Sequence, residues 1–284
     1  VEVGSPMKRP PVCFVGFFGL NRSLRWTLGS IRRNVLGPLR EQGFDLRIAA
    51  HFNAPMKIDS IRSRESNVRP AMSHQGLPLE ICWSEPQSDT TLHRYPELVS
   101  SPHFLSGSSE ERQTKMNLGL QLHSLLRLWG LCRTIGADGA DVFVLLRPDL
   151  QYLDPIDAAE IHSQIADAGI DLITPDWHQW GGLNDRLAFC SARGASSYCQ
   201  RLYRAPHHLA KTGDLHGETF LKSVADEDGL RLGLMKARAM RVRSDGKTWR
   251  EGFDLPPLTN LVAVTRVYRR RLSIGSELPN SRRG

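Results

Sequence analysis

The apolar run PVCFVGFF, residues 11–18, constrains the fold most, because it carries no charge and ends at Gly19. Such a run is typical of a strand buried on both faces of a parallel sheet. Apolar residues spaced three or four apart follow it and predict an amphipathic helix, which Pro38 ends or kinks. These apolar residues are Leu24, Leu28, Ile31, Val35 and Leu39. The run DLRIAAHF, residues 45–52, predicts a second strand, so the segment forms one βαβ unit.

The alternation of helix and strand returns after Glu110. Apolar residues between positions 118 and 132 have helical spacing, and they lead into a strand, DVFVLLRPD, at residues 141–149. Further strands are predicted within residues 171–180, 186–191 and 238–244, and further helices within residues 194–205 and 217–229. This pattern predicts an α/β fold with a mostly parallel, Rossmann-like sheet and helices on both faces.

We expect a single domain over residues 11–260. Inside it, residues 53–109 are rich in Pro, Ser, Arg and His, and they predict a long loop region with one short strand near LEICW. Residues 1–10 are expected to form an N-terminal arm, in which VEVGSP resembles a cloning remnant. Residues 261–284 are expected to form a basic C-terminal tail, either solvated or in peripheral contact with a membrane surface.

The composition narrows the classes of partner. The 284 residues carry a net charge of +7, which favours anionic ligands. Nucleic acid is not expected, because no recognition motif accompanies the charge. The five cysteines form no CxxC pair, so we expect free thiols in a reducing, cytoplasmic location. No apolar stretch reaches the roughly 18 residues of a membrane span, and we expect no signal peptide.

A first polar cluster follows the first predicted strand, where ligands bind in open α/β sheets. In GFFGLNRS, residues 16–23, Asn21 and Arg22 stand at the turn into the helix, and Arg25 follows. A helix N-terminus can receive a phosphate group, so these three residues are candidates to contact a nucleotide. The alternative is that Asn21 or Ser23 only caps the helix.

A second cluster, LLRPDLQYLDP, ends the strand at residues 142–146. It resembles the strand end of GT-A-type glycosyltransferases, in which Asp-x-Asp holds a divalent metal on the diphosphate of a nucleotide-sugar. Asp149 matches the second acidic position, whereas Arg147 occupies the first. Arginine repels a metal but binds a diphosphate directly. The resemblance therefore implies a diphosphate site at Arg147 and Asp149, with Mn²⁺ or Mg²⁺ held by Asp149 or absent. The alternative is an ion pair that closes the strand.

A third cluster, WHQWGGLNDRLAF at residues 177–189, resembles the Trp-Gly-Gly-Glu-Asp-Asp segment of β-1,4-galactosyltransferases. In that family the segment lines the acceptor site and carries the catalytic base. The resemblance implies stacking of a sugar on Trp177 or Trp180 and a close backbone approach at Gly181 and Gly182. Its other candidates are Asn184, which stands where the usual base would be, and Asp185, which is the remaining carboxylate. The alternative is a tight turn capped by Asn184 and Asp185.

A last candidate pair lies in DLHGETFL, residues 214–221. Glu218 is a second candidate for the catalytic base, and His216 is a candidate metal ligand or phosphate contact. Both residues also suit a purely structural role, since a glutamate in a first helical turn is favourable electrostatically.

Together these clusters predict an enzyme that transfers a sugar from a UDP- or GDP-sugar donor to a hydroxyl acceptor, such as a glycan, a polysaccharide or a small molecule. Two alternatives remain open at this point. One is a sulfotransferase, which NRSLRWT resembles faintly. The other is a non-catalytic basic α/β module that binds polyanions or membranes.

Overall fold

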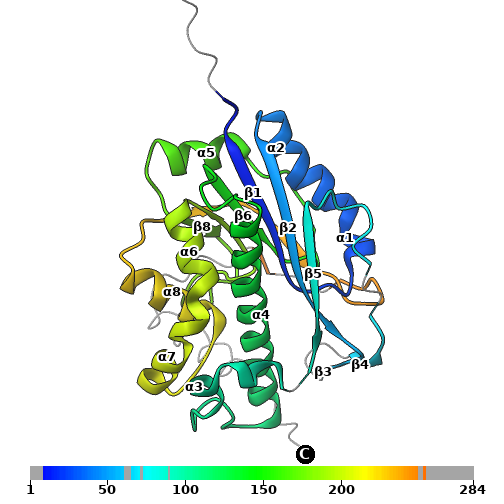
Figure 1. Ribbon diagram of the computed structural model, residues 1–284, viewed down its shortest axis with the longest axis vertical. Coiled ribbons are helices and arrows are strands. Elements are labelled where there is room, and N and C mark those ends of the chain that lie inside the picture. Colours follow the sequence, from blue (N-terminus) through cyan, green and yellow to red (C-terminus); the bar gives the residue numbers. More distant parts are fainter. Residues whose placement is uncertain (1–8, 61–64, 71–72, 89, 249–251, 254–284) are drawn as a thin grey trace, which may run out of the picture.

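The computed structural model describes residues 9–60, 65–70, 73–88, 90–248 and 252–253. The predicted basic tail at residues 261–284 and most of the predicted N-terminal arm lie outside these residues. The described chain forms one mixed α/β domain with a mostly parallel central sheet flanked by helices (Figure 1). The α/β fold class predicted from the sequence is confirmed.

The central sheet has seven strands in the order β10–β8–β9–β6–β1–β2–β5. Their bounds are Val12–Leu20 (β1), Asp45–Pro55 (β2), Ile81–Gln87 (β5), Val142–Leu146 (β6), Leu172–Pro175 (β8), Leu187–Cys190 (β9) and Leu232–Met235 (β10). β1 pairs in parallel with β2 and β6, β2 with β5, and β8 with β10. β9 is antiparallel to both of its neighbours, β6 and β8.

Strand β1 shows why the sheet needs cover on both faces. Val15 and Phe17 pack into one hydrophobic cluster, whereas Phe14 and Phe18 pack into another. Because successive side chains of a strand point to opposite faces, an unbroken apolar run needs apolar neighbours on both sides.

Helices cover each face of the sheet (Figure 1). The first face packs against α1 (Leu24–Ile31), the π-helical turn η1 (Arg32–Leu36), α2 (Gly37–Glu41) and α5 (Ala158–Ala166). The second face packs against α4 (Ser109–Thr134), α6 (Ala192–Gln200) and α8 (Gly217–Glu227). A third cluster joins α4 and α8 to the short elements η2 (Thr91–Arg94), α3 (Pro96–Val99), η3 (Arg201–Arg204) and α7 (Ala205–Thr212).

The helix predicted after β1 is divided by its π-helical turn. Pro38 has no backbone N–H, so the carbonyl of Asn34 loses its usual helical donor. The backbone N–H of Ile156 donates to that carbonyl at 2.8 Å instead. The interruption therefore ties this helix to the segment that leads into α5.

Residues 53–109 contain more regular structure than the predicted loop region. They include β3 (Ile58–Ser60) and β4 (Glu65–Val68), which form a small hairpin, as well as β5, η2 and α3. Leu92, Leu98 and Phe104 are fully buried in the third cluster. They stand six residues apart, too sparsely to mark the period of a helix or a strand, so the sequence pattern does not reveal them.

The predicted late strand is also present, but outside the central sheet. β11 (Ala239–Arg241) pairs in antiparallel register with β7 (Leu150–Tyr152), the short strand that follows Asp149. This pairing brings a segment from the end of the domain to the carboxyl end of β6.

Two expectations from composition can be compared with the structure. All five cysteines are free. None of the helices in the described residues combines the length and apolarity that crossing a membrane requires.

The strand order places a topological switch point between β1 and β6. From β1 the chain adds β2 and then β5 on one side, and it later returns to place β6 on the other side of β1. Loops that leave the carboxyl ends of two such strands diverge and form a crevice between them. Arg22 follows β1 and Arg147 follows β6, so both predicted arginines lie at this crevice.

Candidate active site

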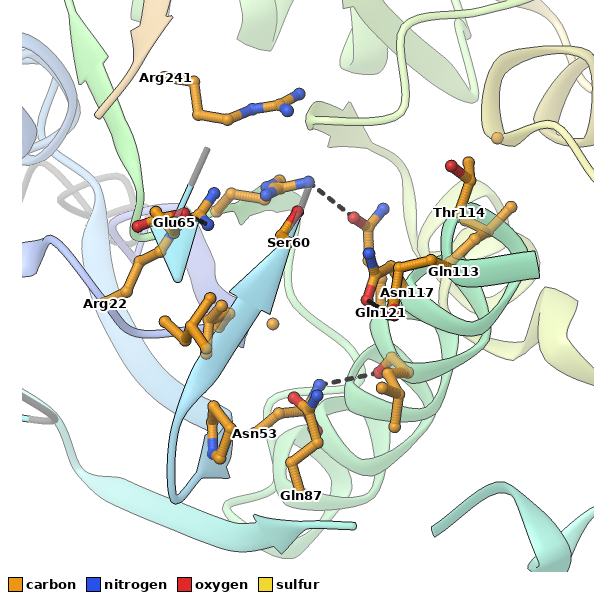
Figure 2. A pocket seen from close by; sticks show the side chains of 18 of the residues that line it. Arg22, Asn53, Ser60, Glu65, Gln87, Gln113, Thr114, Asn117, Gln121 and Arg241 are labelled. Carbon is orange, nitrogen blue, oxygen red and sulfur yellow. Dashed lines mark hydrogen bonds and ion pairs between the residues drawn. The ribbon is translucent and has the colours of Figure 1, made fainter. Parts of the chain in front are cut away.

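A cavity of about 930 Å³ lies at this crevice. Its walls come from the turn after β1, the ends of β2 and β6, the first turns of α4, the start of α8, and β11. Figure 2 shows Arg22 and Glu65 on one side, and Gln113, Asn117 and Gln121 of α4 on the other. Segments far apart in the sequence therefore build one polar site.

Asp149 is the centre of the charged network beneath the cavity. Arg147 donates to it twice, from Nε to Oδ1 and from Nη2 to Oδ2, both at 2.9 Å. Arg22 Nη2 donates to the same Oδ2 at 3.0 Å, and Arg22 Nη1 donates to Glu65 at 2.6 Å. Asp149 is only 1% exposed, whereas Arg147 keeps 17% of its side chain exposed and lines the cavity.

The charges of this network stabilise one another. Burial alone would disfavour the charged form of each group. The attraction between Arg147 and Asp149 outweighs burial, so the pKa of Asp149 lies below its ordinary value and the pKa of Arg147 lies above. The ion pair between Arg147 and Asp149 at the end of β6 is thus present, and Arg147 also faces the cavity.

The divalent metal implied by the resemblance does not fit Asp149 as it is placed. Both carboxylate oxygens already accept hydrogen bonds from guanidinium groups, and two adjacent positive charges repel a cation. In the described chain, one group of His, Cys, Asp and Glu side chains lies close enough together to share an ion. Neither Asp149 nor His216 belongs to that group. The chemistry proposed below therefore uses no metal.

Arg241 supplies a further positive charge on the wall of the cavity. It enters from β11, opposite Leu150 of β7. In the described chain its Nε is buried without a hydrogen-bond partner, and Figure 2 shows its side chain without a bonded neighbour. Burial and the positive charges of Arg186 and Arg147 hold the pKa of Arg241 well below its ordinary value. An anion in the cavity would relieve this repulsion.

Two carboxylates, Asp185 and Glu218, lie on the cavity wall near α4 and α8. Asp185 Oδ2 accepts a hydrogen bond from Gln121 at 2.9 Å, and Gln121 Oε1 accepts one from Arg147 at 2.8 Å. Gln121 therefore links this carboxylate to the arginine network. His216 Nδ1 lies 3.4 Å from Glu218 Oε2.

The position of Glu218 disfavours its ionised form. Burial, reinforced by the negative charge of Asp185, raises the pKa of Glu218 to about 8. Glu218 is therefore the poorer candidate for a general base at neutral pH, and Asp185 is the better one.

The paired glycines explain how the two carboxylates come so close. A Cβ on Gly182 would lie 1.9 Å from the backbone oxygen of Glu218, and that oxygen accepts a hydrogen bond from Leu183 N at 3.0 Å. Gly181 has a φ of 83°, a conformation that favours glycine. The glycines therefore seat the start of α8 against the Asp185 segment.

Among the two tryptophans and Asn184 of the third cluster, only Trp180 lines the cavity. Trp177 is buried in the first hydrophobic cluster, where its Nε1 donates to the carbonyl of Ala237 at 2.8 Å. Asn184 is fully buried and bonds to the backbone of Trp177 and Arg186. Of the two tryptophans, only Trp180 is placed where it can contact a sugar in the cavity.

The candidates of the first polar cluster, Asn21, Arg22 and Arg25, also differ in whether they line the cavity. Arg22 lines the cavity. Asn21 is fully buried and donates to the carbonyl of Ser73 at 3.1 Å. Arg25 donates to the carbonyl of Ser244 at 3.1 Å and stacks over Trp26. Neither residue lines the cavity, because Asn21 lies in the interior and Arg25 lies at the exposed surface.

Sequence reasoning missed Arg241, Arg243, Gln121 and Glu65. The two arginines alternate in RAMRVRS, and a period of two places both on one side of an extended segment. That alternation was an available signal, but it does not say which strand the segment joins. Gln121 and Glu65 carry no motif, and only their tertiary contacts reveal them.

Replacing Glu218 by glutamine is expected to remove a pH-dependent loss of stability. The folded-state pKa of about 8 lies above the ordinary 4.5, so folding favours the protonated form. The stability of the wild type therefore falls as the pH rises from about 4.5 to about 8. Since each pKa unit corresponds to about 1.4 kcal/mol, we expect Glu218→Gln to be more stable than the wild type by about 2–4 kcal/mol at pH 8.5.

Denaturant unfolding at pH 5 and pH 8.5 measures this difference. Glu97→Gln, at an exposed glutamate of α3, is the control and should follow the wild type at both pH values. Equal stability of wild type and Glu218→Gln at pH 8.5 would contradict the placement of Glu218.

Comparison with known proteins gives distant structural matches. No protein-family model matches the chain, and neither does any curated protein. A glycosyltransferase involved in the glycosylation of the major capsid of PBCV-1 is 11% identical, with a TM-score of 0.42, over 80% of this chain and 82% of that one. Mouse xyloside xylosyltransferase 1, in its apo form, is 14% identical, with a TM-score of 0.38, over 79% and 84%. Likenesses this distant carry no argument about what the protein does.

Proposed function

We propose that the protein is a glycosyltransferase that moves a sugar from a nucleotide-sugar donor to a hydroxyl acceptor. The observation that carries this proposal is Arg241, a half-buried arginine whose buried Nε has no hydrogen-bond partner in the described chain and which faces a cavity at the switch point of an α/β sheet. Guanidinium groups suit the planar recognition of diphosphates. The two carboxylates on the cavity wall supply the acid–base chemistry that sugar transfer needs.

In the proposed site the diphosphate of the donor contacts Arg241 and Arg147. Asp149, which also accepts a hydrogen bond from Arg22, holds Arg147 in place from below. The polar face of α4 offers amide groups, Gln113 and Asn117 among them, to the hydroxyl groups of a saccharide. Trp180 provides an aromatic surface on the same cavity.

In an inverting transfer, Asp185 accepts the proton of the acceptor hydroxyl as its oxygen attacks the anomeric carbon of the donor. The bond between that carbon and the diphosphate oxygen breaks, and the bonding electrons leave with the nucleoside diphosphate. Arg241 and Arg147 stabilise the charge that develops on this leaving group. Glu218, protonated at neutral pH, donates a hydrogen bond within the site.

Replacing Arg241 by methionine is expected to weaken the binding of UDP or GDP by about 10–100-fold. The variant keeps an unbranched apolar stem but removes the charge-assisted hydrogen bonds to the diphosphate, worth about 1.5–3 kcal/mol. Calorimetric titration measures the change. Arg238→Met is the matched control, because Arg238 lies three residues earlier, pairs with Asp154 at 2.6 Å and does not line the cavity. Unchanged affinity in Arg241→Met would contradict the proposed diphosphate site.

Ligand-induced thermal shift tests the class of donor. Stabilisation by UDP or GDP supports sugar transfer, whereas stabilisation by adenosine 3′,5′-bisphosphate alone would support sulfate transfer instead. Hydrolysis of nucleotide-sugars, with and without Mn²⁺, then identifies the donor and tests whether the reaction proceeds without a metal.

A further inference from the structure

A second polar cluster lies between β2, β5 and α4. His51, Glu85 and His123 come from these three elements, and their exposed fractions are 0%, 8% and 0%. Their nearest side-chain nitrogen and oxygen atoms all lie within 4.8 Å of one another. None of the three residues lines the cavity of the proposed active site.

Ser124 determines which ring nitrogen of His51 carries the proton. Ser124 Oγ donates its single hydrogen to the carbonyl of His51 at 2.8 Å and accepts from Gly19 N at 2.7 Å. His51 Nδ1 lies 3.0 Å from the same oxygen and must therefore donate to it. In the neutral ring, Nε2 is left with a lone pair.

That lone pair faces another acceptor. His51 Nε2 is buried without a hydrogen-bond partner in the described chain, and it lies 3.7 Å from Glu85 Oε1. With its proton on Nδ1, the neutral ring of His51 presents a lone pair to the carboxylate of Glu85. Two acceptors at this separation, with no hydrogen between them, are satisfied by a cation.

His123 can present its own lone pair to the same point. Its Nε2 lies 3.1 Å from Glu85 Oε2, and its Nδ1 lies 2.7 Å from the hydroxyl of Tyr95. A phenol can donate or accept a hydrogen bond. The proton of His123 can therefore reside on Nδ1, bonded to Tyr95, while Nε2 becomes a ligand.

The distances between the histidine nitrogens and the carboxylate oxygens of Glu85 suit a transition-metal ion. Ligand distances of about 2.0–2.2 Å around tetrahedral Zn²⁺ place neighbouring ligand atoms about 3.3 Å apart. The observed 3.1 and 3.7 Å lie on either side of that value. A separate cavity of about 350 Å³, lined by His123, Tyr95 and Arg127, offers a path from solvent.

Two arginines oppose a cation at this point. Arg127 and Arg94 donate to Glu85 at 2.8 and 3.1 Å. Their side chains are 44% and 59% exposed, so both can turn into solvent when an ion takes their place. An ion and the arginines therefore compete for one carboxylate, which gives the site a distinctive test.

We propose that His51 Nε2, His123 Nε2 and the carboxylate of Glu85 bind one divalent transition-metal ion, with Zn²⁺ best suited to this ligand set. The ion would join the edge strand β5 to β2 and α4.

Titration of the chelator-treated full chain with Zn²⁺ alone tests this site. We expect one ion per chain by elemental analysis, and an affinity at least about 100-fold weaker in His51→Gln and in His123→Gln. His103→Gln, at an exposed histidine, is the control and should bind as the wild type does. Absence of bound Zn²⁺ in the wild type, or equal binding in all variants, would overturn the proposal.

Two further measurements keep the test decisive if the histidine variants fail to fold. Co²⁺ added to the wild type should give the intense visible absorption of a four-coordinate ion, and the weak spectrum of a six-coordinate ion would contradict the site. Arg94→Gln should bind Zn²⁺ more tightly than the wild type because it removes a competitor for Glu85. Weaker or unchanged binding in Arg94→Gln would also count against the proposal.

Discussion

Replacing Asp185 by asparagine is expected to lower the rate of sugar transfer by about 10²–10⁴-fold, the range typical of a lost general base. Asparagine has nearly the same shape, and its side-chain oxygen can still accept the hydrogen bond from Gln121. It cannot accept the proton of the acceptor hydroxyl. The affinity for the nucleoside diphosphate should stay close to that of the wild type, because the arginines that bind it are unchanged.

Transfer rates at saturating donor and acceptor measure this effect, together with calorimetry for the diphosphate. Glu218→Gln is the matched control, because it replaces the other carboxylate with an amide that still donates a hydrogen bond. We expect it to lose less activity than Asp185→Asn at pH 7. A larger loss in Glu218→Gln would assign the role of base to Glu218 instead.

Replacing Asp149 by asparagine is expected to destabilise the fold by about 3–5 kcal/mol, the usual cost of removing one partner from a buried ion pair. Arg22 and Arg147 would both lose their shared carboxylate. The substitution changes no volume, so the loss comes from uncompensated charge. Stability should also fall in strong acid, where the wild-type carboxylate with its lowered pKa at last takes up a proton.

Urea unfolding at pH 7 measures this loss. Asp154→Asn is the matched control from the same motif, since Asp154 is 38% exposed and pairs with the exposed Arg238. Surface pairs of this kind contribute about 0–1 kcal/mol. A cost below about 1 kcal/mol for Asp149→Asn would show that Asp149 does not organise the arginine network.

The sequence predicts the parts of the site that are local to strand ends. PVCFVGFF and VFVLL are unbroken apolar runs, so their burial and pairing follow from composition. Arg22 and Arg147, which follow the two strands, then meet at the switch point. Asp185 and Glu218 are close in space because the adjacent glycines, Gly182 and Gly217, leave no Cβ in the way.

Other parts of the site depend on contacts that no local pattern encodes. Arg241 belongs to a three-residue strand whose partner, β7, lies about 90 residues earlier, and so short a pairing has no specific signature. Trp177 and Trp180 stand three residues apart in one motif, yet one is in the core and the other is at the cavity. The left-handed backbone of His178 and Trp180 produces that divergence, and sequence spacing does not reveal it.

A crystal structure with UDP or GDP bound tests the central claim most directly. The account predicts diphosphate oxygens within hydrogen-bond distance of the Arg241 guanidinium, in the cavity beyond β1 and β6, with Arg147 still paired to Asp149. A nucleotide ordered at any other place on the protein, with the cavity occupied only by solvent, would contradict it.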